Sequence, residues 1–180
     1  MTMKRIFSFV WETAKIVLIA LVIIIPIRYY LIQPFFVRGA SMEPNFSNGQ
    51  YLVIDELSYR FDDPTRGDVI VFKYPLDPSK YYIKRIVGLP GEEIRIKDGQ
   101  IFIYDTDSSQ EIALDESLYL SGETFTLGQV NFSLDEQEYF VLGDNRQSSS
   151  DSRQWGALPQ DNIVGRVWLR AWPFNLAETF

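Results

Sequence analysis

One short segment of this 180-residue sequence has a composition typical of the residues around a catalytic nucleophile. Ser41 lies in VRGASMEPNF, residues 37–46, where Gly39 and Ala40 leave room for another backbone to come close. The sequence contains no histidine and no cysteine, so thiolate catalysis, a disulfide framework and a zinc knuckle are excluded. If Ser41 attacks a substrate, its proton must therefore pass to an aspartate, glutamate, lysine or tyrosine.

Lys84 is the lysine best placed to be that base. In YYIKRIVGLPG, residues 81–91, the alternation of a β-strand places Tyr82, Lys84 and Ile86 on one face. A lysine on an apolar face loses hydration, which lowers its pKa, and a neutral amine can deprotonate a serine. The alternative is an ordinary surface lysine whose stem packs on Tyr82, with Ser41 as a turn or cap residue.

A third segment is dense with hydrogen-bonding side chains. It reads LGDNRQSSSDSRQWG, residues 142–156, and follows an apolar strand. Asp144, Arg146, Asp151 and Arg153 stand at spacings that favour charge pairs. We interpret the segment as a polar frame that holds a site in place; the alternative is a flexible polar loop.

The elements that must position these residues begin with an apolar N-terminal helix. Residues 16–27 carry no charge, and residues 11–32 are long enough to cross a hydrocarbon core of ~30 Å. Lys4, Arg5 and Lys15 favour a cytoplasmic N-terminus. We therefore expect a short cytoplasmic segment (1–10), a transmembrane anchor (11–32) and an extracytoplasmic domain (33–180). The alternatives are a buried core helix and a cleaved signal peptide, although no small-x-small step follows the apolar run.

The rest of the sequence predicts a mainly β fold. Short segments rich in Val, Ile, Tyr and Phe recur over residues 51–104 and again near the C-terminus. Asp98-Gly99 suits a type I′ turn, with isoleucines alternating on both sides. Residues 105–138 are acidic and weakly patterned, and we interpret them as a variable β insertion without a catalytic role. The expected architecture is an antiparallel, barrel-like or two-sheet domain.

The charge distribution is uneven but argues against nucleic-acid binding. The net charge is −7, made of +4 over residues 1–38 and −11 over residues 39–180. No block is basic enough for a nucleic-acid footprint. We also expect no metal and no cofactor, because the proposed chemistry needs neither.

Four ordered motifs resemble the type I signal peptidases, a family of membrane-anchored Ser/Lys endopeptidases. The motifs are GASMEPNF, RGDVIVFKYP, YYIKRIVGLPGEEIRIKDGQIFI and GDNRQSSSDSRQWGALPQDNIVGRVWLRAWPF. The resemblance implies Ser41 as nucleophile, Lys84 as general base and Ser149 as the serine that orients the lysine. It also implies structural partners around the site, namely Arg85, Asp144, Arg146, Asp151 and Arg153.

The sequence departs from the family pattern at two positions near Ser41. The family motif usually continues with proline and threonine, whereas this sequence has Pro44-Asn45-Phe46. We expect this difference to change packing more than chemistry. Gly39 occupies a position where some members have a serine that helps to stabilise the oxyanion; glycine occurs there in small Gram-positive-type members.

The resemblance implies removal of signal peptides from exported pre-proteins at small-x-small sites, through an acyl-enzyme. We expect the substrate to add as an extended strand, with pockets lined by Val37, Met42, Tyr82 and Ile83. The expected partners are signal peptides, the lipid bilayer and a nearby secretion translocon.

Two questions stay open at this stage. Trp168, Trp172 and Phe174 are either core residues of the last strand or residues that enter the lipid interface. The alternative functions are a non-catalytic anchored module that binds precursors during surface-fibre assembly, and a self-cleaving repressor-type peptidase.

Overall fold

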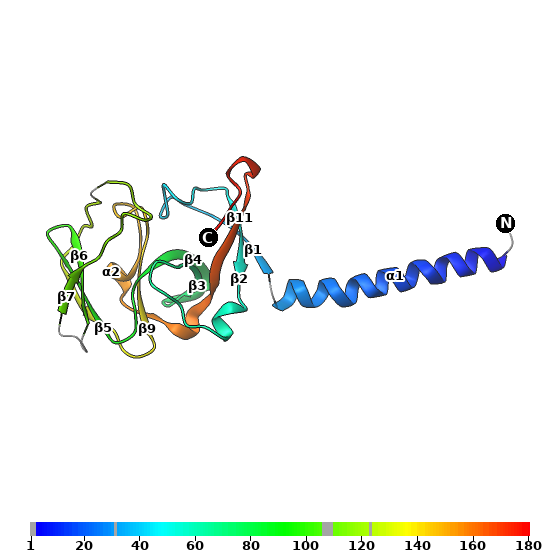
Figure 1. The fold of residues 1–180 in the computed structure, drawn as a ribbon, viewed down its shortest axis with the longest axis horizontal. Helices are drawn as coiled ribbons and strands as arrows, with labels where there is room; N and C mark the ends of the chain where they lie inside the picture. Colours follow the sequence, from blue (N-terminus) through cyan, green and yellow to red (C-terminus); the bar gives the residue numbers. More distant parts are fainter. Residues whose placement is uncertain (1–2, 31, 106–109, 123) are drawn as a thin grey trace.

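An apolar helix projects from a β-sheet body in the computed structural model, which describes residues 3–30, 32–105, 110–122 and 124–180 (Figure 1). Helix α1 spans Met3–Tyr30, and its segment Ile6–Ile24 has a mean hydropathy of 2.1 and is long enough to cross a membrane. None of that segment is buried against the body. The alternative of a buried core helix is therefore wrong.

The larger sheet carries the segments that hold Ser41 and Lys84. Its strand order is β1-β2-β11-β3-β4-β9-β10, with β12 paired to β11, and every pair is antiparallel. The strands span β1 Ile32–Phe36, β2 Tyr51–Asp55, β3 Val69–Tyr74, β4 Asp77–Gly88, β9 Glu138–Leu142, β10 Leu158–Pro159, β11 Ile163–Trp172 and β12 Glu178–Thr179. Short helices connect some of them, namely η1 Ser58–Arg60, α2 Ser152–Trp155, η2 Gln160–Asn162 and η3 Phe174–Leu176.

A second, four-stranded antiparallel sheet has the order β7-β6-β5-β8. Its strands span β5 Glu92–Lys97, β6 Gln100–Asp105, β7 Gln110–Ala113 and β8 Val130–Ser133. The predicted hairpin is confirmed, since Ile94 pairs with Ile103 and Ile96 with Ile101. Asp98 and Gly99 have φ values of 53° and 82°, as a type I′ turn requires. The expected mainly β, antiparallel fold is confirmed.

Three apolar clusters fix the elements relative to one another. The first joins the turn after β1 to β2, β3 and β11, and includes Val37, Met42 and Phe46. The second lies between the two sheets and contains the hairpin isoleucines. The third joins β3, β4 and β9, with Tyr82 packed against it. Both faces of β3 and much of β4 are therefore covered, so the strand that carries Lys84 has little freedom to shift.

The aromatic residues of β11 and the segment after it do not belong to these clusters. Trp168 is 44% exposed, Trp172 is 47% exposed and Phe174 is 77% exposed. The core alternative for these three residues is therefore wrong. They lie on or next to β11, in the same sheet as β1, which follows α1 (Figure 1).

Candidate active site

Ser41 sits on a tight turn between β1 and β2. The backbone N–H of Phe46 donates to the Met42 carbonyl at 2.8 Å, and the N–H of Glu43 donates to the Ala40 carbonyl at 3.2 Å. Met42 is 1% exposed and Phe46 is fully buried, so both side chains anchor the turn in the first apolar cluster. Ser41 itself stays partly accessible. The turn therefore presents its hydroxyl from a fixed backbone.

Lys84 meets Ser41 inside the protein. Its Nζ lies 2.7 Å from Ser41 Oγ and 2.8 Å from the Ile83 carbonyl oxygen. Only 3% of the residue is exposed, and the Tyr82 ring centroid is 5.4 Å from Nζ. Burial lowers the pKa of Lys84 to about 8, although the negative charges of Asp151 and Asp144 oppose the change. A neutral amine at this position can accept the serine proton while it donates to the Ile83 carbonyl.

The residue after Lys84 fixes its strand to the polar segment. Arg85 Nε and Nη2 donate to the two carboxylate oxygens of Asp144 at 2.8 and 2.7 Å, and Nη1 donates to the Gly67 carbonyl at 2.8 Å. The Asp144 carboxylate is completely buried. Such a two-point ion pair fixes orientation as well as distance. The sequence analysis expected charge pairs within residues 142–156, but the sheet register brings Arg85 of β4 to Asp144.

Asp151 closes the other end of the polar segment. Its carboxylate accepts from Arg153 Nε and Nη2, both at 2.8 Å, as the sequence spacing predicted. It also accepts from the Gly143 N–H at 3.1 Å and caps helix α2 through the Arg153 N–H. Asp151 has no exposed surface. Residues 143–153 therefore form a closed, rigid loop beside the lysine.

Asn145 contacts the nucleophile turn directly, and the sequence analysis missed it. Its backbone N–H donates to the Ser41 carbonyl at 3.0 Å, and its side-chain amide donates to the Ala40 carbonyl at 3.1 Å. These bonds set the direction of the peptide groups on both sides of Ser41. The available signal was its place inside the GDNR motif, between Asp144 and Arg146.

Ser149 is buried, with 9% of the residue exposed. Its hydroxyl has no hydrogen-bond partner within the described parts of the chain. A bond from Ser149 to Lys84, which the resemblance implied, therefore stays a prediction.

Arg146 shows that the insertion is not independent of the site. Its Nη1 and Nη2 donate to the Glu116 carboxylate at 2.7 and 2.5 Å, Nη1 also donates to Thr126 Oγ1 at 2.7 Å, and Nε donates to the Gly143 carbonyl at 3.0 Å. The Arg146 side chain is 1% exposed. The expectation that residues 105–138 have no catalytic role stays a prediction. Glu116 and Thr126 nevertheless join this segment to the polar segment, because they bind the buried Arg146 guanidinium.

A cleft of about 420 Å³ opens in front of the Ser41 and Lys84 side chains. Val37, Tyr82 and Ile83 line it, as predicted. Met42 does not, because the tight turn directs its side chain into the first cluster. The sequence analysis missed several further lining residues, namely Phe35, Phe36, Leu52, Val71 and Tyr81. Their apolar side chains give the cleft walls suited to small aliphatic groups.

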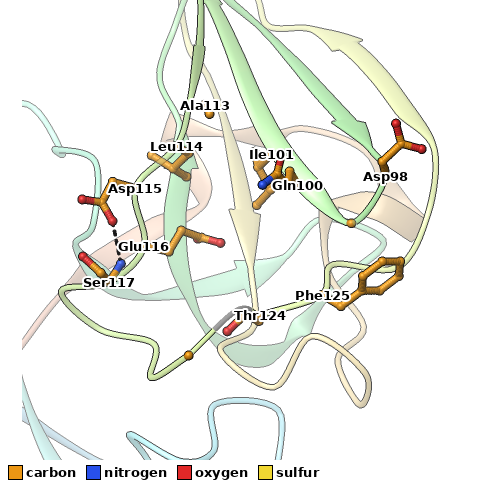
Figure 2. Close-up of a pocket in the computed structure, with 12 residues that line it drawn as sticks. Asp98, Gln100, Ile101, Ala113, Leu114, Asp115, Glu116, Ser117, Thr124 and Phe125 are labelled. Carbon is orange, nitrogen blue, oxygen red and sulfur yellow. Dashed lines mark hydrogen bonds between the residues drawn. The ribbon is translucent and has the colours of Figure 1, made fainter.

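A second pocket, of about 360 Å³, lies between the β5–β6 hairpin and the insertion (Figure 2). Figure 2 shows Asp115 and Glu116 on one side of it and Asp98 and Phe125 on the other. Neither Ser41 nor Lys84 lines this pocket. Among the described residues, no group of histidine, cysteine, aspartate and glutamate side chains is arranged to hold a metal ion.

By its fold, the chain is a mainly β protein with an apolar helix, α1, ahead of its first strand. Residues 10–172 match the family model described as signal peptidase, peptidase S26. The chain therefore belongs to the signal peptidase family and is a membrane-anchored peptidase.

Two relatives whose sequences match over most of this chain agree with this assignment. The chain is 34% identical to "Probable signal peptidase I-2" of Synechocystis sp. over 90% of its own length and 73% of the relative. It is 34% identical to signal peptidase I P of Bacillus subtilis subsp. natto, over 96% and 94% of the two chains. A crystal structure of a signal peptidase I from Enterococcus faecalis is 28% identical and covers 59% of this chain and 97% of its own, with a TM-score of 0.48.

Glu116→Ala should destabilise the protein, because it leaves the Arg146 charge buried without its carboxylate partner. Removing one member of a buried pair costs about 3–5 kcal/mol of unfolding free energy. The measurement is equilibrium unfolding of the detergent-solubilised full chain. Glu136→Ala is the matched control: Glu136 is an exposed glutamate of the same segment, so its replacement should change the free energy by no more than about 0.5 kcal/mol. Equal values for the two variants would contradict the structural role of Glu116.

Gly143→Ala should abolish most of the activity without unfolding the protein. A Cβ at this position would lie 2.2 Å from Ser149 Oγ and 2.4 Å from the Ser41 carbonyl oxygen, so the nucleophile turn must move. A displacement of ~1 Å at a reacting group can cost about 100-fold in rate. The measurement is kcat/KM on a precursor peptide, with the exposed neighbour Gln147→Ala as control. Wild-type activity in Gly143→Ala would show that the turn tolerates the shift.

Proposed function

We propose that this peptidase removes signal peptides from exported pre-proteins, with Ser41 as nucleophile and Lys84 as general base. The observation that carries the proposal is the 2.7 Å contact between Lys84 Nζ and Ser41 Oγ in a buried setting. Membership of the signal peptidase family supports the substrate class. A non-catalytic precursor-binding module is not favoured, because both groups are present and in contact. A cytosolic repressor-type peptidase is not favoured, because α1 is suited to cross a membrane.

The reaction begins with proton transfer to the lysine. Neutral Lys84 takes the proton of Ser41, and Oγ attacks the carbonyl carbon of the scissile peptide bond. The resulting oxyanion faces the backbone N–H of Ser41, since Gly39 has no hydroxyl to offer. Protonated Lys84 then gives its proton to the leaving amine as the C–N bond breaks, and the signal peptide stays attached to Ser41 as an ester.

Hydrolysis of the ester restores the enzyme. Lys84, neutral again, takes a proton from a water molecule, whose oxygen attacks the ester carbonyl. The lysine returns this proton to Ser41 Oγ as the acyl group leaves. Ser149, with its buried and unpartnered hydroxyl, is proposed to orient the amine through this cycle. No step requires a metal or a cofactor.

The substrate is proposed to bind as an added strand. Strand β1 lies at the end of the larger sheet, and residues 81–84 of β4 pair only with β3 among the described strands. Both flank the cleft, so each offers an unpaired backbone edge to an extended peptide. The apolar walls at Val37 and Ile83 suit small side chains at the −1 and −3 positions.

The proposed membrane topology follows from charge and exposure. Residues 1–10 lie in the cytoplasm because Lys4, Arg5 and Lys15 favour that side, residues 11–32 span the bilayer, and residues 33–180 lie outside. The exposed Trp168, Trp172 and Phe174 are proposed to enter the lipid interface. This places the cleft near the membrane surface, close to the secretion translocon from which precursors emerge.

Ser41→Ala and Lys84→Met should each abolish cleavage and leave the fold intact. Neither histidine nor cysteine is present to replace the lost group. The measurement is cleavage of an exported precursor, with N-terminal sequencing of the product and circular dichroism of each variant. Substantial activity in either folded variant would refute the dyad.

The pH dependence should report the pKa of Lys84. With a pKa of about 8, roughly one lysine in ten is neutral at pH 7, against about one in 2,500 for a lysine in water. We expect kcat/KM to rise tenfold per pH unit on the acid side and to level off above about pH 8. Tyr82→Asn should admit water, raise the pKa and move the plateau to higher pH; Tyr104→Asn on β6 is the control. A wild-type rate that still rises past pH 10 would contradict the desolvation of Lys84.

The same pKa change affects stability with a defined sign. The unfolded chain binds the lysine proton more tightly than the folded chain does, because the folded pKa is lowered. The resulting destabilisation is fully present below about pH 8 and disappears as the pH rises to the unfolded pKa of ~10.4.

A further inference from the structure

Asn45, one of the two residues that depart from the family motif, makes contacts with three separate segments. Its side-chain Nδ2 donates to Asp144 Oδ2 at 2.8 Å and to the Tyr119 carbonyl at 2.7 Å. Its own carbonyl accepts from Arg170 Nη1 at 2.7 Å. The side chain thus joins the nucleophile turn to the polar segment and to the insertion, while β11 holds its backbone.

The Asp144 carboxylate leads from this contact to the lysine strand. Asp144 Oδ2 accepts from both Asn45 and Arg85, and Arg85 directly follows Lys84 on β4. Asn45 is four residues after Ser41. A short path therefore connects Ser41 to Lys84 through Asn45, Asp144 and Arg85. Its hydrogen bonds are 2.7 to 2.8 Å long, and the Asp144 and Arg85 residues are buried.

The contact to Tyr119 extends this path to the insertion. The Tyr119 ring centroid lies 4.1 Å from the Arg85 guanidinium carbon, and its hydroxyl donates to Glu116 at 2.6 Å. By fixing the Tyr119 carbonyl, Asn45 holds this ring over the Arg85–Asp144 pair. The pair is then shielded from water, which strengthens it.

A primary amide is suited to this position because one nitrogen carries two N–H groups. Each meets an acceptor from a different segment. A threonine hydroxyl has one hydrogen and can satisfy only one of them. An aspartate would set a second carboxylate against Asp144. A leucine has similar volume and no donor.

We infer that Asn45 is a positioning residue for the Ser41–Lys84 pair, acting through the Asp144 carboxylate and the Tyr119 backbone. The inference rests on the proposed function of that pair. Asn45 does not line the cleft, so it acts on the alignment of the reacting groups and leaves substrate binding unchanged. The sequence suggested that this departure from the family motif changes packing more than chemistry, whereas the inferred role of Asn45 is the alignment of the reacting groups.

The test compares Asn45→Leu and Asn45→Thr with wild type in the full chain. We expect kcat to fall roughly 10- to 100-fold in Asn45→Leu, with KM within about threefold, because loss of a donor to a charged group displaces the reacting atoms. Asn45→Thr keeps one donor and should lie between Asn45→Leu and wild type. Asn131→Leu, the same substitution at an exposed position of β8, should match wild type.

A pH profile separates alignment from a loss of stability. Lys84 faces the negative Asp144 and Asp151, their cationic partners Arg85 and Arg153, the Tyr82 ring and, beyond Gly143, Arg146. The N–H of the Asn45 amide points its positive end at the Asp144 carboxylate and offsets part of the negative potential that reaches Lys84. Without this N–H the negative potential at Lys84 increases, so the pKa of the lysine rises and the acid limb of kcat/KM moves to higher pH.

The outcomes are distinct. A lower kcat together with a shifted acid limb supports the inference. Wild-type kcat in Asn45→Leu, a change in KM alone, or a lower melting temperature with an unmoved acid limb would overturn it. If Asn45→Leu fails to fold, the kcat and acid limb of Asn45→Thr decide in the same way. Ser41→Ala and Lys84→Met run in the same assay: activity in these variants removes the proposed function, whereas their inactivity beside an unaffected Asn45→Leu removes only this inference.

Discussion

The contact between the Lys84 amine and the Ser41 hydroxyl depends on a balance of charge around a buried lysine. Desolvation favours the neutral amine, whereas two buried carboxylates stand close enough to favour the ammonium. Each of these carboxylates is held in a two-point pair with its own arginine, Asp144 with Arg85 and Asp151 with Arg153. Their net field at the amine is thereby reduced, and desolvation decides the pKa. The arginines are thus as important to the lysine as the carboxylates are.

Buried ion pairs of this kind are weak contributors to stability, because desolvation offsets most of their attraction. The three apolar clusters supply the stability, and they also fix where β3, β4 and β9 lie. The hydrogen bonds of the polar segment, residues 142–156, orient the groups around Ser41 and Lys84. Asn145 orients the peptide groups beside Ser41, and Asp151 fixes the Gly143 N–H. Apolar packing therefore sets the distance between the turn that carries Ser41 and the strand that carries Lys84, and hydrogen bonds set the angles.

Much of this arrangement could be read from local patterns. Strand alternation placed Lys84 on the same side of β4 as Tyr82 and Ile86, and the Asp98-Gly99 turn identified the hairpin, because both follow from two-residue periodicity and turn chemistry. Contacts between distant segments could not be read in this way. The pairing of Arg85 with Asp144 follows from sheet register, and the pairing of Glu116 with Arg146 follows from how the insertion folds back. The inward direction of Met42 depends on the closure of a tight turn that a strand pattern does not describe.

The short connection between α1 and β1 has a consequence for the substrate. Helix α1 ends at Tyr30 and β1 begins at Ile32, so the strand that flanks the cleft is tied almost directly to the membrane helix (Figure 1). A signal peptide is likewise held in the bilayer by its own apolar segment. An extended chain advances ~3.3–3.6 Å per residue. The height of Ser41 above the membrane is set by α1 and β1, and the substrate chain starts from the point where its apolar segment leaves the bilayer. The number of residues between that apolar segment and the scissile bond therefore decides whether the bond reaches Ser41.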